Sequence, residues 1–220
     1  VGSEMCIRDR DRAGHVWIGT GQNGISFLSF VKSKFTHHRY DQENEWGLKS
    51  DKIYSITTMT DGMMWAATGF GLEMLSPDGI REYDYEKSVL GVNYIIDLEI
   101  INDENLWVGT DQGVLKINTM TDMITRFSKS DTIPESRRLA DNLVHDILPI
   151  DDKIWVATGS GVVIIDTSSN NVTNFSSDLI ARVITQDQDG DIWLGTEMDG
   201  LYTIPSKLMA GPTGLTKISP

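Results

Sequence analysis

A short stretch that begins with tryptophan occurs five times in this chain of 220 residues, and the repeat constrains the fold more than any other feature. The copies read "WIGTGQNGI" from residue 17, "WAATGFGL" from 65, "WVGTDQGV" from 107, "WVATGSGV" from 155 and "WLGTEMDGL" from 193. The tryptophans are separated by 48, 42, 48 and 38 residues. A strand-rich repeat with a period of about 40 to 45 residues is typical of the blades of a β-propeller.

Each repeat contains four strand-like segments in the same order. An apolar stretch such as "YIIDLEII" at 94 is followed by an acidic or glycine turn and then by the tryptophan strand. After a glycine turn come a strand such as "GVLKIN" at 113 and a short strand that ends in an aromatic residue, such as "ITRF" at 124. We therefore predict an all-β fold, a β-propeller of four-stranded antiparallel blades with about five blades present.

The residue types of the tryptophan strand predict close stacking of blades. Alternate residues share a face, so each tryptophan lies on the side of the residue two positions later, which is always small. The residue between them is apolar, which indicates burial on both faces. The pairs are Trp17 with Gly19, Trp65 with Ala67, Trp107 with Gly109, Trp155 with Ala157, and Trp193 with Gly195.

A threonine and a glycine recur in the turn after each tryptophan strand. The threonine suits a strand, and its hydroxyl can hydrogen-bond into the turn. The glycine is expected to supply a positive φ between two strands. We interpret both as structural, since neither brings catalytic chemistry. They are Thr20, Thr68, Thr110, Thr158 and Thr196, and Gly24, Gly71, Gly113, Gly161 and Gly200.

The repeat also predicts how the chain is divided. Residues 1–10 fit no repeat and resemble a translated sequencing-adapter segment, so we expect them, with Cys6, to be non-native and the chain to be a fragment. The blades 11–204 are expected to form an incomplete arc of a larger propeller rather than a closed ring. The expected parts are 11–47 (a partial blade without its first strand), 48–92, 93–138, 139–179, 180–204 (an incomplete blade) and 205–220 (a tail or the outer strand of the last blade).

Charge and cysteine content exclude some classes of function. The chain has 19 Lys and Arg against 32 Asp and Glu, a net charge of −13, and no basic run that could follow a phosphate backbone, so nucleic acid is not expected as a partner. A single cysteine can form neither an internal disulfide nor a multi-cysteine zinc site. No uninterrupted apolar run of about 18 residues or signal-peptide pattern occurs, so the chain itself is expected to be soluble.

Five copies of an acidic turn, a W-φ-G/A-T strand and a G-φ strand, with approaches such as "LKSDKI" at 48 and "LADNLV" at 139, resemble two-component regulator propeller repeats. The resemblance covers about residues 11–204. It implies the periplasmic ligand-sensing region of a membrane-anchored hybrid two-component histidine kinase, of a kind common in Bacteroidetes, that works as a homodimer. It also implies a carbohydrate-derived ligand, no cofactor and no enzymatic activity in this chain.

If a ligand binds, the turns that follow the tryptophan strands are the expected contacts, because such turns converge at one mouth of a propeller channel. Their amides, carboxylates and one aromatic side chain would suit a sugar or a related small molecule. The alternative interpretation is that they are ordinary turn residues around a scaffold. The candidates are Gln22, Asn23, Phe70, Asp111, Gln112, Ser160, Glu197, Met198 and Asp199.

Other motifs favour structural interpretations. "DQDGDIWLGTE" at 187 begins like a calcium loop, but its glycine and twelfth residue do not fit, so a blade turn is expected. "HHR" at 37 has no further ligand spaced to complete a metal site, and an outer strand is expected. Asp97 and Glu99 could flank a sugar, line a channel or face solvent. No metal site is predicted. A propeller lyase or hydrolase acting on polysaccharide and a secreted binding or scaffold propeller remain alternative functions.

Overall fold

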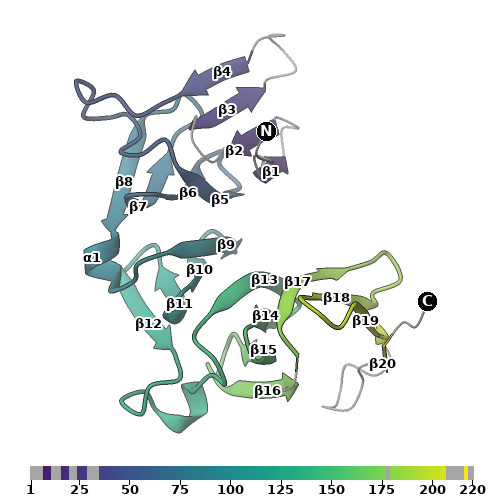
Figure 1. Cartoon of the computed structure of the whole chain (residues 1–220). Coiled ribbons are helices and arrows are strands. Elements are labelled where there is room, and N and C mark those ends of the chain that lie inside the picture. The colour runs from purple at the N-terminus through teal and green to yellow at the C-terminus, as the bar shows by residue number, and fades with distance from the viewer. Residues whose placement is uncertain are drawn as a thin grey trace. The chain divides into compact units, whose positions relative to one another are not determined.

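The computed structural model of the chain describes residues 7–10, 16–19, 24–28, 35–176, 179–206 and 216–217. These residues form five four-stranded sheets, and in each sheet the spatial order of the strands follows their order in the chain (Figure 1). This confirms the predicted four-stranded blades. The chain divides into two compact units, residues 1–108 with 118–122 and residues 109–117 with 123–220. No helix within the described ranges is long and apolar enough to cross a membrane.

The first unit contains two complete sheets. The first comprises β1 (Ile7–Arg10), β2 (Val16–Gly19), β3 (Ile25–Leu28) and β4 (Phe35–His38). The second comprises β5 (Ile53–Thr58), β6 (Met64–Thr68), β7 (Gly71–Leu75) and β8 (Arg81–Glu86), and the short helix α1 (Lys87–Leu90) follows it.

The division between the units passes through the third sheet. That sheet comprises β9 (Ile95–Ile101), β10 (Asn105–Thr110), β11 (Gly113–Asn118) and β12 (Met123–Phe127), and the 3-10 turn η1 (Glu135–Arg137) follows it. The fourth sheet comprises β13 (Val144–Ile150), β14 (Lys153–Thr158), β15 (Gly161–Asp166) and β16 (Val172–Ser176). The fifth comprises β17 (Ala181–Gln186), β18 (Ile192–Thr196), β19 (Leu201–Ile204) and β20 (Thr216–Lys217).

The first sheet corrects one prediction. The first blade was expected to lack its first strand, but β1 pairs antiparallel with β2, from Ile7 opposite Gly19 to Arg10 opposite Val16. An unpaired strand edge presents a row of N–H and C=O groups that an extended segment can satisfy whatever its side chains. The repeat pattern does not report such backbone pairing.

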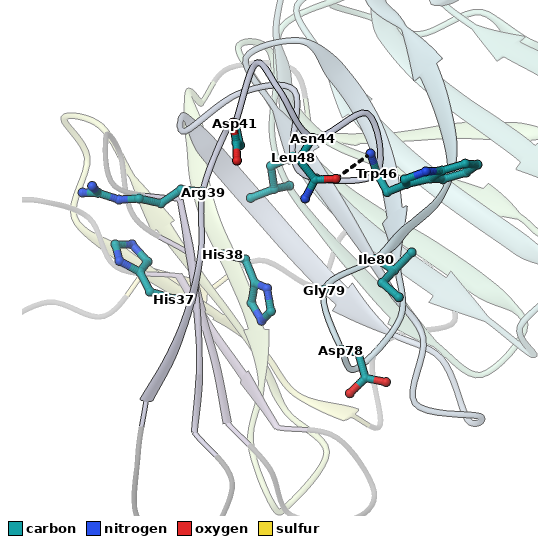
Figure 2. Close-up of a pocket in the computed structure, with 11 residues that line it drawn as sticks. His37, His38, Arg39, Asp41, Asn44, Trp46, Leu48, Asp78, Gly79 and Ile80 are labelled. Atoms are coloured by element: carbon teal, nitrogen blue, oxygen red, sulfur yellow. Dashed lines mark hydrogen bonds between the residues drawn. The ribbon is translucent and has the colours of Figure 1, made fainter.

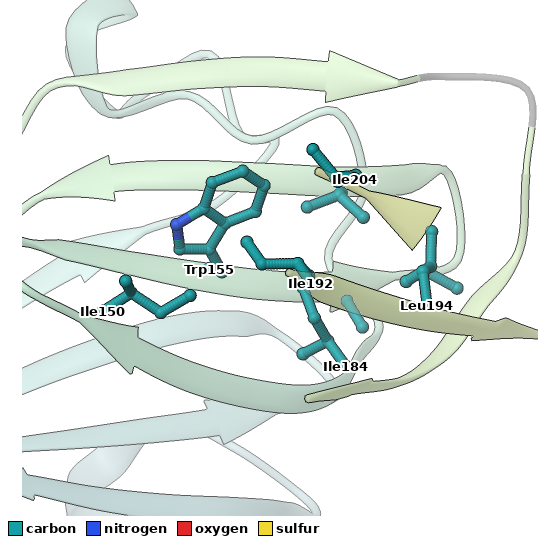
Figure 3. Close-up of a cluster of buried hydrophobic side chains, with 9 residues drawn as sticks. Ile150, Trp155, Ile184, Ile192, Leu194 and Ile204 are labelled. Carbon is teal, nitrogen blue, oxygen red and sulfur yellow. The ribbon is translucent and has the colours of Figure 1, made fainter. Parts of the chain in front are cut away.

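Each unit has a core between neighbouring sheets. In the first unit, Trp17 packs among residues of the first and second sheets, including Ile25, Ile53 and Ile56. In the second unit, Trp155 packs among residues of the fourth and fifth sheets, including Ile184 and Ile192 (Figure 3). Each tryptophan is 1% exposed. Stacking of blades through the repeated tryptophan therefore forms the core of both units.

The small residue of the tryptophan strand permits this stacking. A Cβ added at Gly19 would lie 2.7 Å from Cγ2 of Ile53 on β5, and one at Gly109 would lie 2.6 Å from Cγ1 of Val144 on β13. Real Cβ atoms are not found so close to a carbon atom. The neighbouring sheet thus occupies the space that a larger side chain would need.

The repeated threonines close the turns as expected. The hydroxyls of Thr68, Thr110 and Thr158 each donate to the carbonyl oxygen of the turn glycine three residues later, at 2.7 to 3.2 Å. Thr196 donates to Gly200, four residues later, at 2.8 Å. Each threonine oxygen also accepts a backbone N–H from within the turn. Thr20 lies outside the described residues.

The prediction about the turn glycines is confirmed at four positions and wrong at one. The φ angles are +76° at Gly24, +110° at Gly113, +102° at Gly161 and +79° at Gly200, whereas that of Gly71 is not positive. Gly71 is required for space, because an added Cβ would overlap the carbonyl oxygen of Tyr85 on β8. The same kind of overlap with the outer strand would occur at Gly24 and Gly113.

Candidate functional site

The predicted ligand residues lie where the second strand of each sheet turns into the third. The first strand of the sheet begins at the same end, since the two strands are antiparallel, as in the pairing of Val144 with Thr158. Connections between sheets therefore meet these turns: Leu143 accepts from the N–H of Gly159, and Ile180 accepts from the N–H of Glu197. We call this end of each sheet the turn end. Gln22 and Asn23 lie outside the described residues.

At the turn end of the first unit, Phe70 lies within a group of aromatic and lysine side chains. The Lys49 ammonium lies 4.4 Å from the centroid of the Phe70 ring and forms an ion pair with Asp84 at 2.5 Å. The Phe70 carbonyl accepts the backbone N–H of Lys87 at 3.3 Å. The Lys87 ammonium in turn lies 5.4 Å from the centroids of both Tyr54 and Tyr94. We call Tyr54, Phe70, Lys87 and Tyr94 the aromatic–lysine cluster.

At the turn end of the second unit, polar side chains from both sheets form a connected group. Ser160 donates its hydroxyl to Asp141 at 3.0 Å. Arg182 lies 3.2 Å from Nδ1 of His145 and forms an ion pair with Glu197 at 2.8 Å. Asp141 and Glu197 are also close enough to His145 to influence its titration. We call Asp141, His145, Ser160, Arg182 and Glu197 the polar network.

The protonation and the tautomer of the His145 imidazole follow from its neighbours. Burial and the Arg182 guanidinium lower the pKa of His145, while Glu197 and Asp141 act in the opposite direction. Because arginine can only donate, Nδ1 is the acceptor and the neutral ring carries its proton on Nε2. Nε2 is buried and has no hydrogen-bond partner in the described part of the chain. The imidazole thus helps to position Arg182.

The structure brings together two of the predicted residues, Ser160 and Glu197, through the polar network. Asp111 and Gln112 hydrogen-bond to each other at 3.3 Å. Met198 is 87% exposed, and the N–H of Asp199 donates to Thr196 within its own turn. Sequence reasoning missed four residues because they lie outside the tryptophan motif. They are His145 and Arg182 in the first strands of their sheets, Tyr94 directly before β9, and Lys87 in the helix between β8 and β9.

A cleft of about 780 Å³ lies on the first unit and borders the turn end of the first sheet, where the His38 carbonyl lies against Gly24. It is lined by the end of the outer strand β4, by side chains of the segment that follows it as far as Leu48, and by the 78–80 turn between β7 and β8. Figure 2 shows His38 pointing toward Gly79, while His37 and Arg39 project from the other side of the chain and the Trp46 ring points away. Burial lowers the pKa of His38. Since its polar side chains do not converge, we do not favour this cleft as the site.

The remaining motifs have structural roles. Asp187 accepts the N–H groups of Asp189 and Asp191 and the indole N–H of Trp193, and the last of these bonds, above all, lowers the pKa of Asp187. This supports the blade-turn interpretation of the calcium-like segment. Asp97 accepts the hydroxyl of Ser55 at 2.9 Å and so links β9 to β5. No group of three His, Cys, Asp or Glu suited to a metal occurs in the part of the chain that the structure describes.

Comparison with known families supports the resemblance noted in the sequence. Residues 168–198 match the family described as "Two component regulator propeller". This segment runs from the β15–β16 turn through the fifth tryptophan strand. No curated protein matches the chain in sequence.

Solved propeller structures resemble the chain closely in fold. The extracellular domain of a protein described as a hybrid two component system of B. thetaiotaomicron has a TM-score of 0.73 and 20% identity, over 94% of this chain and 27% of that one. PorZ, a surface component of the type-IX secretion system of Porphyromonas gingivalis, has a TM-score of 0.71 and 14% identity, over 97% and 33%. Virginiamycin B lyase of Staphylococcus aureus has a TM-score of 0.69 and 17% identity, over 97% and 69%. At these identities the likeness establishes the β-propeller fold alone.

Proposed function

We propose that the chain is part of the periplasmic ligand-sensing propeller of a hybrid two-component histidine kinase and that its turn ends recognise a carbohydrate-derived ligand. The family match at residues 168–198 is the observation that carries this proposal. The fold shared with the extracellular domain of a two-component system supports it, although the chain spans only 27% of that protein's length.

The turn ends support ligand recognition by their chemistry. Sugars are recognised by hydrogen-bonding side chains that are held in place and by aromatic rings that stack on the sugar. The polar network offers Arg182 and Glu197, whose side chains are 44% and 40% exposed. Their ion pair orients both side chains, and His145 also orients Arg182. The aromatic–lysine cluster offers Tyr94, which is 57% exposed. Held, half-exposed polar groups lose less conformational entropy on binding than free ones.

By this proposal the parent receptor is membrane-anchored and dimeric, and a kinase lies downstream of the propeller. Ligand binding would shift the population between two arrangements of the dimer, in proportion to the difference in affinity between them. The extracellular origin of the B. thetaiotaomicron domain supports a site outside the cytoplasm.

The proposal is tested by titration calorimetry of the 220-residue chain against a panel of neutral and acidic oligosaccharides. We expect binding to at least one member, without consumption of the sugar, and at least a fivefold weakening by Arg182→Ala or Glu197→Gln if the polar network contacts the ligand. The control is Lys153→Ala, which replaces an exposed residue at the opposite end of β14. An intact, folded parent sensor region that binds none of the panel would contradict the carbohydrate ligand.

An enzymatic function is the second candidate, because His145, Arg182 and two carboxylates converge at one turn end and a lyase shares the fold. The geometry counts against it. A general base must offer an accessible lone pair, but Arg182 covers Nδ1 of His145 and Nε2 is buried. Turnover of a polysaccharide that His145→Gln abolishes would favour the enzyme. A secreted parent without a kinase would favour a non-catalytic binding or scaffold propeller.

A further inference from the structure

We propose that His145 makes the ligand site of the second unit sensitive to acid: the neutral imidazole holds Arg182 in place for the ligand, and the protonated imidazole releases it. This inference rests on the proposed function, because it describes the regulation of the site that the polar network forms. His145 is a positioning residue in this account, since it acts on the ligand through Arg182.

Two β-bulges bring the side chains of His145 and Arg182 together. His145 is the extra residue where the pairing of β13 with β14 shifts its register. Arg182 is the extra residue at the corresponding shift of β17 against β18. A bulge re-aims a side chain, and bulges are common next to functional sites. Because both bulges lie at the turn ends of neighbouring sheets, they present the imidazole and the guanidinium to each other.

The contacts of Arg182 require a neutral imidazole. Nη1 of Arg182 lies 3.2 Å from Nδ1 of His145, and Nη2 pairs with Glu197 at 2.8 Å. A guanidinium has only donors, so Nδ1 must offer its lone pair. Nε2 is buried and carries a proton in both states of the ring, so protonation changes the Nδ1 side alone. There it sets an N–H donor and a positive charge against the guanidinium.

The charged groups around His145 determine what happens in acid. In the part of the chain that the structure describes, they are Arg182 in β17, Glu197 directly after β18 and Asp141 before β13. Burial and Arg182 hold the pKa of His145 below its ordinary value, so the ring is neutral at neutral pH. Once protonated, the ring is attracted to both carboxylates, and Glu197 is the one that holds Arg182. Acid therefore removes one contact of Arg182 and competes for the other.

Release of Arg182 weakens ligand binding through a loss of preorganisation. A guanidinium that is held on two sides loses little freedom when a sugar binds, whereas a released one must be ordered by the ligand. The affinity for a neutral sugar is therefore highest above the titration of His145 and falls as the pH drops through it. Because binding and protonation are linked reciprocally, a ligand that needs the neutral ring must also lower the pKa of His145.

The first arm of the test needs no ligand. NMR spectra of the imidazole nitrogens and the arginine side chains of the 220-residue chain are recorded from about pH 8 to about pH 5. We expect the Nε2-protonated tautomer of His145 at the high end, and Arg182 signals that change with the midpoint of the His145 titration. Arg182→Ala is expected to raise the pKa of His145, and Glu197→Gln to lower it. The control His37→Gln, at an exposed histidine of the first unit, leaves that pKa unchanged.

The second arm measures, by calorimetry over the same pH range, binding of the hexamers of β-linked glucose, xylose and mannose and of α-linked glucose. These sugars carry no acidic group, so only the protein titrates. We expect the affinity to fall about fivefold from the high to the low end. His145→Gln keeps an amide oxygen that can accept from Arg182 but does not titrate, so this fall is expected to disappear, whereas His37→Gln retains it. Circular dichroism confirms that each variant stays folded throughout the pH range.

The outcomes separate this inference from the function on which it rests. Equal affinity at both ends of the pH range, an unchanged pH dependence in His145→Gln, or Arg182 signals that do not follow the titration of His145 overturns the acid sensitivity. If a sugar nevertheless binds and Arg182→Ala weakens it, the sensor proposal stands and only the role of His145 fails. If no carbohydrate binds the chain or the intact parent sensor region, both fail.

Discussion

Trp155 of the fourth sheet and Trp193 of the fifth occupy the same place in the same sequence motif, yet their environments differ. Trp155 is 1% exposed and packs against Ile184 and Ile192 of the fifth sheet (Figure 3). Trp193 is partly buried, and its indole N–H donates to Asp187 at 2.7 Å. Val183 and Leu201 of the same sheet are 56% and 41% exposed. The motif determines the strand and its turn, whereas burial of the ring depends on the next sheet.

The small glycine of the tryptophan strand also differs in its surroundings between β10 of the third sheet and β18 of the fifth. A Cβ at Gly109 would meet Val144 of the fourth sheet, whereas among the described residues a Cβ at Gly195 would meet only Val183 of its own sheet, at 3.8 Å. One sequence pattern therefore contributes to stability unequally along the chain.

The largest predicted difference is between truncations of the two tryptophans. Trp155→Ala removes a fully packed ring and is expected to lower the free energy of unfolding by about 3 to 5 kcal/mol. Trp193→Ala removes a partly exposed ring and one hydrogen bond, and about 1 kcal/mol is expected. Urea denaturation of the two variants measures both values. Equal losses would mean that the fifth tryptophan is as well packed as the fourth.

The glycine comparison predicts a smaller contrast. Gly109→Ala places a methyl group against Val144 and is expected to cost about 1 to 3 kcal/mol. Gly195→Ala meets no close neighbour, and a change within about 0.5 kcal/mol is expected. Thermal denaturation of both variants is the measurement. A destabilised Gly195→Ala variant would reveal a packed face on the fifth sheet.

Glu73 breaks the repeat in a way that predicts a pH effect. It is fully buried on β7, at a position occupied by Val163 in the fourth sheet, and burial raises the pKa of Glu73. The folded state therefore holds the proton at a pH where the unfolded chain has lost it. Stability contributed by Glu73 is present below the unfolded pKa and is lost as pH rises through the folded pKa.

The variant Glu73→Gln keeps one acceptor oxygen, placed like the Oε1 that accepts from both Thr68 and the N–H of Lys49, and it does not titrate. Relative to the parent chain, its free energy of unfolding is expected to increase with pH by at most about 1.4 kcal/mol per pH unit within the titration range. Denaturation at several pH values between acid and neutral tests this. A constant difference across that range would contradict a raised pKa.

The smallest predicted effect on stability concerns the polar network. The ion pair of Arg182 and Glu197 is nearly half exposed, so Arg182→Ala is expected to cost only about 0.2 to 1 kcal/mol. The same change is expected to weaken ligand binding at least fivefold if Arg182 contacts the ligand. Chemical denaturation and calorimetry on one preparation compare the two effects. A large loss of stability would assign Arg182 to the scaffold.

Much of the fold could be predicted because it repeats. The tryptophan, the small residue two positions later and the threonine each have one local or stacking role, and five copies make the pattern visible. The pairing of β1 and the space needed at Gly71 could not be predicted, since both depend on backbone contacts with other strands.

The candidate sites were harder to predict because they combine turns with connections of irregular length. Ser160 and Glu197 follow the motif, but their partners Asp141, His145 and Arg182 come from the segments that lead into β13 and β17 or from the start of those strands. Lys87 begins the short helix α1, the only α-helix in the described part of the chain, and Tyr94 follows it. No period in the sequence aligns such residues, so their proximity emerges only when the sheets stack.

The most direct test of the account is to map ligand binding residue by residue with two-dimensional NMR of the isotope-labelled chain and the oligosaccharide panel. The account predicts that chemical shift changes concentrate at the turn ends, at Phe70 and Lys87 to Tyr94 or at His145, Ser160, Arg182 and Glu197, with the tryptophan strands unchanged. Changes confined to the opposite ends of the sheets, or the appearance of cleaved sugar, would contradict a sensor that reads its ligand at the turn ends.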